Sequence, residues 1–194
     1  MSVYFENNLN ILKNSLNSIR EDIFEKLISD SIKVLEHGNK IIVSGLGKNV
    51  PVCEKFIGTM SSLGLNAFYM NTNSAVHGDI GIVHEGDLVI ILTKSGKTVE
   101  SVYLYELLKK RNCEVWLLTF AENSPLAQEI PNVLSIELKH EGDMWNIVPN
   151  NSTTVNLIVL QTLAMEICKR KSIGLDVFKK NHPGGYIGEA LKDV

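Results

Sequence analysis

The sequence predicts an α/β protein built around a mostly parallel sheet. Continuous rather than alternating apolar runs are typical of strands buried on both faces, and such runs occur at 40–45, 66–70, 87–93, 114–120 and 133–138. Segments with helical spacing separate several of these runs, and this alternation favours parallel strands joined by right-handed crossovers. With 194 residues, 44% of them hydrophobic and 21% charged, the chain has the size and composition of one globular domain.

Two helices are expected before the first strand, because apolar residues recur at helical spacing from Tyr4 to about Glu36 and Gly38 then supplies a stop. The further helices are expected at 50–63, 98–111, about 152–171 and near 175–179. We therefore expect a single domain over 1–194, in which helices at about 4–37 precede a sheet core at about 40–171 and a tail at 172–194. Sheets of this kind bind ligands beyond the carboxyl ends of their strands.

The charge, the apolar runs and the cysteines of the chain argue against several classes of function. A net charge of −3 argues against non-specific nucleic-acid binding, and the apolar runs are too short to span a bilayer. The N-terminus lacks the pattern of a signal peptide, so a cytoplasmic protein without a membrane partner is expected. The cysteines, Cys53, Cys113 and Cys168, lie far apart in apolar segments, which suits reduced thiols rather than disulfides, a zinc site or a catalytic nucleophile.

Two glycine-containing loops follow predicted strands and open predicted helices: "SGLGKNV" (44–50) and "TKSGKTVE" (93–100). Free backbone N–H groups and the positive end of a helix favour anions at such junctions. Neither loop is a Walker A motif, since Ile42 and Ile91 stand where its first glycine belongs, and Val50 breaks the Rossmann pattern. Each loop alone is equally consistent with a turn that needs glycine for its backbone conformation.

Other polar residues in the sequence favour a functional role for these loops over a purely structural turn. They are Lys48, which ends the first loop; Glu100, one turn into the helix after the second; and His77, Glu141 and His182 elsewhere. Each has an ordinary alternative: a surface hydrogen bond for a histidine, a solvated glutamate, or a rigid turn for "HPGG".

Taken together, the chain resembles the sugar isomerase (SIS) domain family, closest to its arabinose-5-phosphate isomerases. The motifs that carry the resemblance are "GLGK" (45–48), "AVHGDIGIV" (75–83), "SGKTVE" (95–100), Glu141 with "PNNSTT" (149–154), and "HPGGYIG" (182–188). The SG-x-T/S loop is common to many SIS domains, whereas the two histidine motifs are more specific. Members with a pair of C-terminal CBS modules are longer, so the SIS domain alone is expected.

The resemblance implies a three-layer, flavodoxin-like sheet of five parallel strands flanked by helices. It also implies a homo-oligomer whose neighbouring chains complete each site, with a tetramer favoured and a dimer left open. The implied reaction interconverts D-arabinose 5-phosphate and D-ribulose 5-phosphate without a metal or an organic cofactor. The alternatives are a regulatory module that binds phosphosugars without turnover, and an isomerase for another sugar phosphate such as hexulose 6-phosphate.

The matching positions suit this chemistry, because moving a proton between adjacent carbons requires a base and a group that stabilises an oxyanion. The catalytic candidates are Lys48, His77, Glu100, Glu141 and His182. We expect Glu100 to be the base, a histidine to open the sugar ring and Lys48 to stabilise negative charge. The expected substrate and phosphate contacts are Gly47, Lys48, Asn49, Thr93, Ser95, Gly96, Lys97 and Thr98.

The chain departs from the family pattern at several of these positions. Lys97 replaces a usual glutamate, Lys94 a neutral residue and Asn49 a serine. The segment "DMWNIVPNNST" differs from the usual small, apolar pattern beside the sugar, and Trp145 in it is either a pocket wall or a packed side chain. These changes leave the general chemistry intact and bear on which sugar is accepted, since loops beside the sugar set discrimination.

Overall fold

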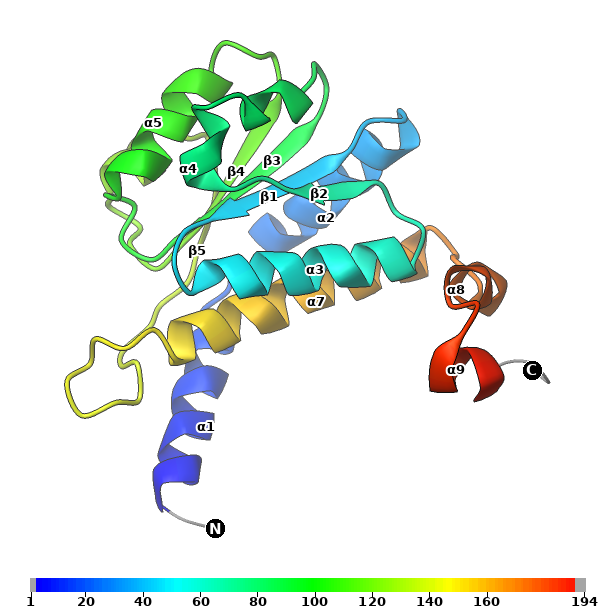
Figure 1. Cartoon of the computed structure of the whole chain (residues 1–194). Helices are drawn as coiled ribbons and strands as arrows, with labels where there is room; N and C mark the ends of the chain where they lie inside the picture. Colours follow the sequence, from blue (N-terminus) through cyan, green and yellow to red (C-terminus); the bar gives the residue numbers. More distant parts are fainter. Residues whose placement is uncertain (1–2, 191–194) are drawn as a thin grey trace.

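The sheet has five parallel strands in the order β2-β1-β3-β4-β5, in a computed structural model that describes residues 3–190 (Figure 1). The strands are β1 (Ile41–Gly45), β2 (Ala67–Tyr69), β3 (Leu88–Thr93), β4 (Glu114–Thr119) and β5 (Asn132–Ser135). All neighbouring pairs are parallel. The α/β class and the five-stranded parallel sheet are thereby confirmed; the last strand ends at Ser135, earlier than the apolar run at 133–138 predicted.

The apolar runs are continuous because the central strands are covered on both faces. Every residue of β1 and β3 is buried. Within β1, Ile41 and Val43 belong to one hydrophobic cluster and Ile42 to the other, as the period-2 alternation of a strand requires. The core is thus two apolar layers separated by the sheet.

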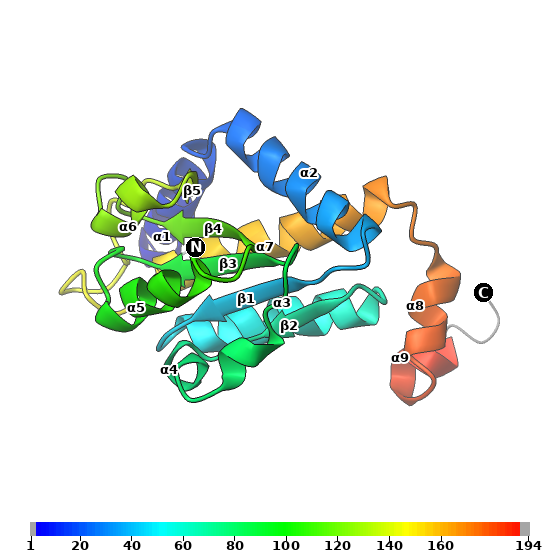
Figure 2. The same cartoon turned by 90° about the horizontal axis from the view of Figure 1, so that it is seen from above.

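Helices form the outer layers of a three-layer sandwich, as predicted (Figure 2). The first cluster packs against the helices α2 (Glu21–Glu36), α3 (Asn49–Ser62) and α7 (Asn151–Arg170). The second packs against α4 (Thr72–Ala75), α5 (Val99–Leu108) and α6 (Pro125–Glu129). The helices α3 and α7 lie side by side across one face of the sheet (Figure 1).

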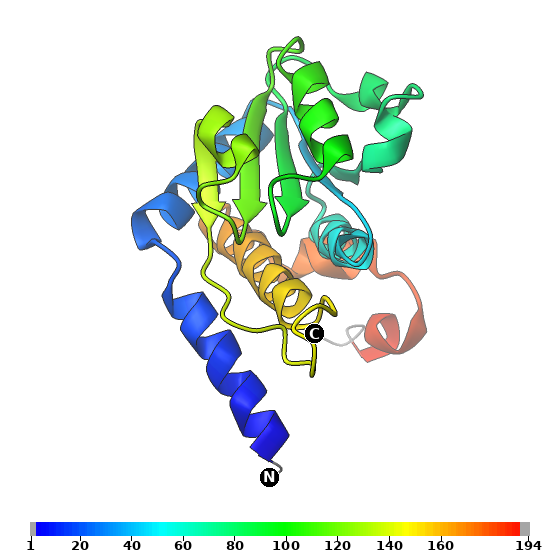
Figure 3. The same ribbon diagram turned by 90° about the vertical axis from the view of Figure 1, so that its left-hand side faces the viewer.

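The two ends of the described chain extend away from this body. The helix α1 (Val3–Asn17) contacts α7, and its N-terminal half projects outward (Figure 3). The helices α8 (Leu175–Asn181) and α9 (Gly185–Ala190) lie beyond the C-terminal end of α3 (Figures 1 and 2). No helix within residues 3–190 is both long and apolar enough to cross a bilayer.

The strand order fixes where a ligand can bind. After β1 the chain moves outward to β2, then returns past β1 to form β3 and continues to the other side. Loops that leave β1 and β3 therefore diverge to opposite faces and open a crevice between them. In parallel sheets this switch point, outside the carboxyl ends of the strands, is where ligands bind.

Candidate functional site

A pocket of about 250 Å³ lies at the carboxyl ends of β1 and β3. Three helices begin beside it: α3, α5 and α7. Its lining residues are Leu46, Gly47, Lys48, Asn49, Leu92, Thr93, Lys94, Ser95, Thr98, Ser101, Pro149, Ser152, Thr153 and Asn156. The two glycine-containing loops thus meet at the predicted edge of the sheet, and the start of α7 forms a third wall.

The loop after β3 supplies hydroxyl groups to the pocket. Thr93 and Thr98 place their Oγ1 atoms 3.5 Å apart, and Ser95 lies beside them in the lining. Two of the loop amides, which we expected to be available to phosphate, already have partners: Gly96 N–H donates to Thr93 Oγ1 at 3.3 Å and Lys97 N–H to Ser95 Oγ at 3.3 Å. The hydroxyl side chains therefore hold the loop in shape as well as facing the pocket.

Gly96 and Lys97 were also expected to contact phosphate, but neither residue lines the pocket. Gly96 has φ +59°, and a Cβ there would lie 2.0 Å from Ser124 Oγ. Only glycine fits a position that combines this backbone conformation with such a close neighbour. The Lys97 side chain is exposed.

The loop after β1 presents one charge and one amide. Gly47 has φ +57°, and Lys48 is exposed immediately before α3. Asn49 opens α3, and its Oδ1 accepts a hydrogen bond from Asn156 Nδ2 of α7 at 3.1 Å. This bond joins the first and third walls of the pocket.

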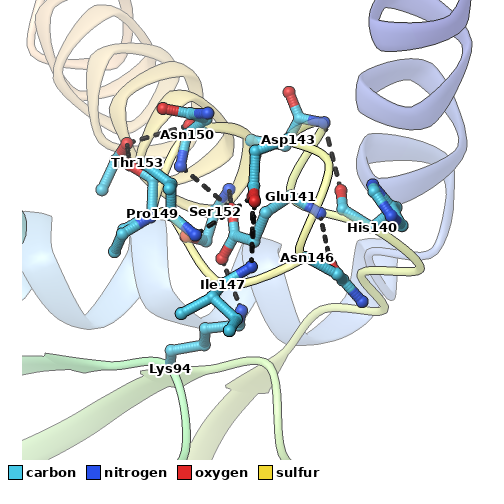
Figure 4. A network of polar contacts seen from close by, with 12 residues as sticks. Lys94, His140, Glu141, Asp143, Asn146, Ile147, Pro149, Asn150, Ser152 and Thr153 are labelled. Carbon is cyan, nitrogen blue, oxygen red and sulfur yellow. Dashed lines mark hydrogen bonds and ion pairs between the residues drawn. The ribbon is translucent and has the colours of Figure 1, made fainter.

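The third wall is held by Glu141 (Figure 4). Its side chain is fully buried, and Oε2 accepts from the backbone N–H groups of Asn150 at 3.1 Å and Ser152 at 2.9 Å. These amides belong to the first turn of α7, where no intrahelical partner exists for them. Glu141 is therefore the cap that begins α7.

Lys94 of the loop after β3 completes this arrangement. Its Nζ lies 2.5 Å from Glu141 Oε1, and about half of its side chain is exposed. Burial by itself would raise the pKa of Glu141, but the ion pair with Lys94 and the hydrogen bond from Ser152 outweigh it and hold the pKa below its ordinary value of 4.5. The carboxylate is ionised, and the loops at 93–98 and 141–150 are joined by an ion pair.

The segment between Glu141 and α7 is organised by two side chains. Asp143 accepts hydrogen bonds from the amides of Trp145, Ile147 and Val148. Asn146, in a left-handed conformation at φ +57°, accepts from Glu141 N–H at 2.8 Å. Trp145 is 66% exposed and absent from the lining, so in this chain it is neither packed nor a wall of the pocket.

The predicted acid and base groups are divided among three places. Glu100 is exposed in the first turn of α5, and His77 is exposed after α4, a helix that packs against α5. Glu141 lies behind the wall of the pocket. His182 is far away: Nδ1 bonds to Phe178 O at 2.8 Å and Nε2 lies 3.4 Å from Ser62 Oγ at the end of α3.

The distance to His182 follows from helix geometry. The 14 residues of α3 separate its first residue, in the pocket, from Ser62, beside His182; at 1.5 Å per residue the helix is about 20 Å long. One chain by itself does not bring His182 to the pocket.

The arrangement suits an anionic ligand. The N-terminal ends of α3 and α5 carry partial positive charge, Lys48 adds a full charge that Glu141 does not compensate, and the hydroxyl side chains of the loop after β3 offer donors. Glu141 already occupies the start of α7, so the other two helices carry the attraction. Among residues 3–190 no group of three or more His, Cys, Asp or Glu side chains is placed to hold a metal ion.

Sequence reasoning missed several lining residues. Ser101, Ser152, Thr153 and Asn156 follow the starts of α5 and α7, and Lys94 stands out in the sequence only as a departure from the family pattern. Asn156 has a visible signal: it is a polar residue among Val155, Val159 and Leu160, which are all buried. The pairing of Lys94 with Glu141 has no such signal in the sequence, because no local pattern links residues so far apart.

Comparisons with known proteins agree with this fold. The SIS domain family model matches residues 34–166. A chain of Escherichia coli CFT073 solved in complex with arabinose 5-phosphate is 30% identical, with a TM-score of 0.84 over 93% of this chain and 94% of that one. A candidate phosphosugar isomerase involved in capsule formation from Bacteroides fragilis is 28% identical, with a TM-score of 0.86 over 94% and 97%.

Among curated proteins, arabinose 5-phosphate isomerase KdsD of Pseudomonas aeruginosa is 29% identical over 179 residues, 92% of this chain and 55% of the relative. The chain spans about half the length of the curated relatives it matches.

Proposed function

Because the chain belongs to the SIS domain family, we propose that it is an aldose–ketose isomerase of sugar phosphates, and that its substrate pair is D-arabinose 5-phosphate and D-ribulose 5-phosphate. The supporting observation is the pocket itself, in which two glycine-containing loops, Lys48, Lys94 and the hydroxyl side chains of Thr93, Ser95 and Thr98 converge at the switch point of the sheet. The relative named arabinose 5-phosphate isomerase and the similar chain in complex with that sugar phosphate support this choice of sugar.

In this proposal the phosphate is anchored at the start of α5. The hydroxyl groups of Ser95 and Thr98 donate to its oxygens, and the positive end of the helix stabilises its charge. The sugar then extends toward Lys48, which stabilises the oxyanion that forms as the proton leaves carbon. Positioning by the phosphate brings the reacting carbons to fixed groups.

The proton transfer is assigned to Glu100. A general base must reach the C–H bond and be free to accept its proton. Both oxygens of Glu141 are engaged, one with α7 amides and the other with Lys94, and its pKa is lowered, which makes it a weak base. Glu100 is exposed at the start of α5, and no such contacts occupy it among the described residues.

Ring opening needs a second acid and base, which this proposal assigns to a histidine. His77 is exposed beside α5, the helix that carries Glu100. His182 would reach a pocket only from another copy of the chain, so the proposal includes a homo-oligomer with shared sites.

Incubation of the purified protein with arabinose 5-phosphate in D₂O, followed by NMR, tests the function. An enediol intermediate predicts ribulose 5-phosphate as product, with deuterium incorporated at the carbon that is reprotonated. Glu100→Gln is expected to reduce kcat by about 10²–10⁴-fold, the usual contribution of a general base, while binding of the sugar phosphate persists. Glu106→Gln, on the same helix and paired with Lys109, is the matched control.

Two results would contradict the proposal. Absence of turnover with all pentose, hexose and hexulose phosphates would exclude the isomerase; thermal stabilisation by the same compounds without turnover would indicate a binding module. Turnover of a different sugar phosphate would retain the reaction and replace the substrate.

A further inference from the structure

Asn156 is a polar side chain held almost entirely inside the protein at the wall of the pocket. It is 1% exposed, and its helical neighbours Val155, Val159 and Leu160 are buried in the apolar core. The residue lines the pocket from α7. An asparagine in such a place is costly unless its amide is satisfied.

Only half of that amide has a protein partner. Nδ2 donates to Asn49 Oδ1 at 3.1 Å, and Oδ1 is buried without a hydrogen bond from any residue in 3–190. Exchanging the oxygen and nitrogen of both amides would reverse the donor and leave Asn156 Nδ2 unpaired instead. In either orientation one polar atom of Asn156 has no protein partner among the described residues.

An unpaired buried polar atom lowers stability, so it is expected to be paired from the pocket when the site is in use. A phosphate dianion only accepts hydrogen bonds, so it cannot satisfy the amide oxygen that is unpaired in this structure; it could pair only with the nitrogen of the exchanged orientation, whereas a hydroxyl group donates and accepts and satisfies either atom. The loops after β1 and β3 supply Lys48 and the hydroxyl groups proposed to hold phosphate, whereas Asn156 stands on α7, which also lines the pocket with Ser152 and Thr153. Asn156 thus places an amide on a different wall from the proposed phosphate contacts.

We propose that Asn156, oriented by Asn49, is a specificity residue that hydrogen-bonds a sugar hydroxyl and so distinguishes a sugar phosphate from phosphate alone. This inference rests on the proposed sugar-phosphate site and adds to it a recognition element for the polyhydroxy part of the ligand. A site built to pair with a hydroxyl rejects ligands that lack it, because its buried amide is then left unpaired.

Calorimetric Kd values for arabinose 5-phosphate and for inorganic phosphate test the inference without requiring turnover. Asn156→Leu, which removes both polar atoms at similar volume, is expected to weaken sugar-phosphate binding about tenfold or more and to leave inorganic phosphate binding within about twofold. Asn132→Leu, at a half-buried asparagine bonded to Lys26 and Glu114 away from the pocket, is the control and should change neither Kd.

A structural role for Asn156 would give a different pattern. Equal weakening of both ligands, or of neither, would overturn the inference, as would a wild-type protein that binds the sugar phosphate no more tightly than phosphate. If Asn156→Leu does not fold, Asn156→Ser, which is too short to keep the contact, is expected to show the same selective loss. Selective loss without any isomerisation would retain Asn156 as a specificity residue and reject the proposed reaction.

Discussion

Gly96 shows how one residue sets the shape of the loop after β3. A side chain there would adopt a left-handed backbone, at a cost of roughly 1–2 kcal/mol, and would overlap Ser124. The loop amide at this position is also the one that bonds Thr93 Oγ1. A backbone shift at Gly96 that relieves the overlap therefore disturbs the hydrogen bond to a hydroxyl group of the pocket.

We expect Gly96→Ala to lower the unfolding free energy by about 2 kcal/mol or more and to weaken phosphate binding, measured by urea unfolding and by calorimetry. Gly58→Ala is the matched control, because Gly58 lies within α3 with ordinary φ and open space around it. That substitution should stabilise the protein by about 0.5–1 kcal/mol. Two changes of the same sign would argue against the conformational explanation.

For single residues, the sequence indicates which chemical groups line the site better than it indicates which side chains contact one another. Ser95 and Thr98 follow a buried strand, which is a local signal, and both line the pocket; their contact with phosphate stays a prediction. The roles of Asn156 and Lys94 could not be predicted, because each depends on a contact with a residue distant in sequence. Asn156 bonds Asn49, 107 residues away, and Lys94 pairs with Glu141, 47 residues away. The role of Lys97 stays a prediction.

The start of α7 is the element on which the third wall depends. Its amides at 150 and 152 are satisfied by Glu141 rather than by a side chain of the N-cap residue, Asn150. Lys94 is the charge that compensates the buried carboxylate. The beginning of this helix and the loop after β3 are therefore energetically coupled.

A double-mutant cycle of Lys94→Met and Glu141→Gln measures this coupling. Each single change is expected to cost about 1–3 kcal/mol, below the cost of breaking a fully buried pair because half of Lys94 is in solvent. The double variant should lose less than the sum of the two. Strict additivity would show that the pair contributes nothing beyond its separate members.

The same carboxylate predicts a pH dependence. Since the pKa of Glu141 is lower in the folded protein than its ordinary 4.5, its contribution to stability is present above that value and is lost as pH falls through the folded pKa. Asp87, whose pKa is held below 3.8 because hydrogen bonds from Lys40 and His84 outweigh its burial, acts in the same direction. The difference in melting temperature between wild type and Glu141→Gln should shrink on acidification; a constant difference would contradict this account.

Elements with a full periodic pattern were predictable, and short ones were not. The helix expected at 50–63 is α3, within one residue at each end, because its buried face repeats over several turns. The short helices α4 and α6, of four and five residues, were missed, since one turn carries no periodicity. Their starts are instead fixed by the side-chain caps Asn71 and Ser124, a local signal that could have found them.

At the scale of the whole molecule, the position of His182 decides how a complete site could form. It stacks on Phe178 with ring centroids 4.0 Å apart, at the opposite end of α3 from the pocket. If histidine chemistry from this tail takes part in the reaction, another copy must supply it. A homo-oligomer with shared sites is the arrangement we propose.

Mixing two inactive variants tests that arrangement. Lys48→Met disables the pocket and His182→Ala disables the tail, and subunits exchanged between them should recover activity in up to about a quarter of the sites, those in which both contributors are intact. Lys48→Met mixed with Glu100→Gln is the control, because both changes lie at the same end of one chain. Recovery in neither mixture would mean that His182 is not supplied across an interface.

The loop at 142–149 has a consequence for how this site could be altered. Its backbone is held by Asp143, Asn146 and Glu141, while Met144, Trp145 and Ile147 are 84%, 66% and 72% exposed. The residues that maintain the loop and the residues that face outward are therefore separate sets. Under the proposed function, laboratory evolution of a new sugar preference can randomise these outward positions at little cost to folding, provided the anchors are left unchanged.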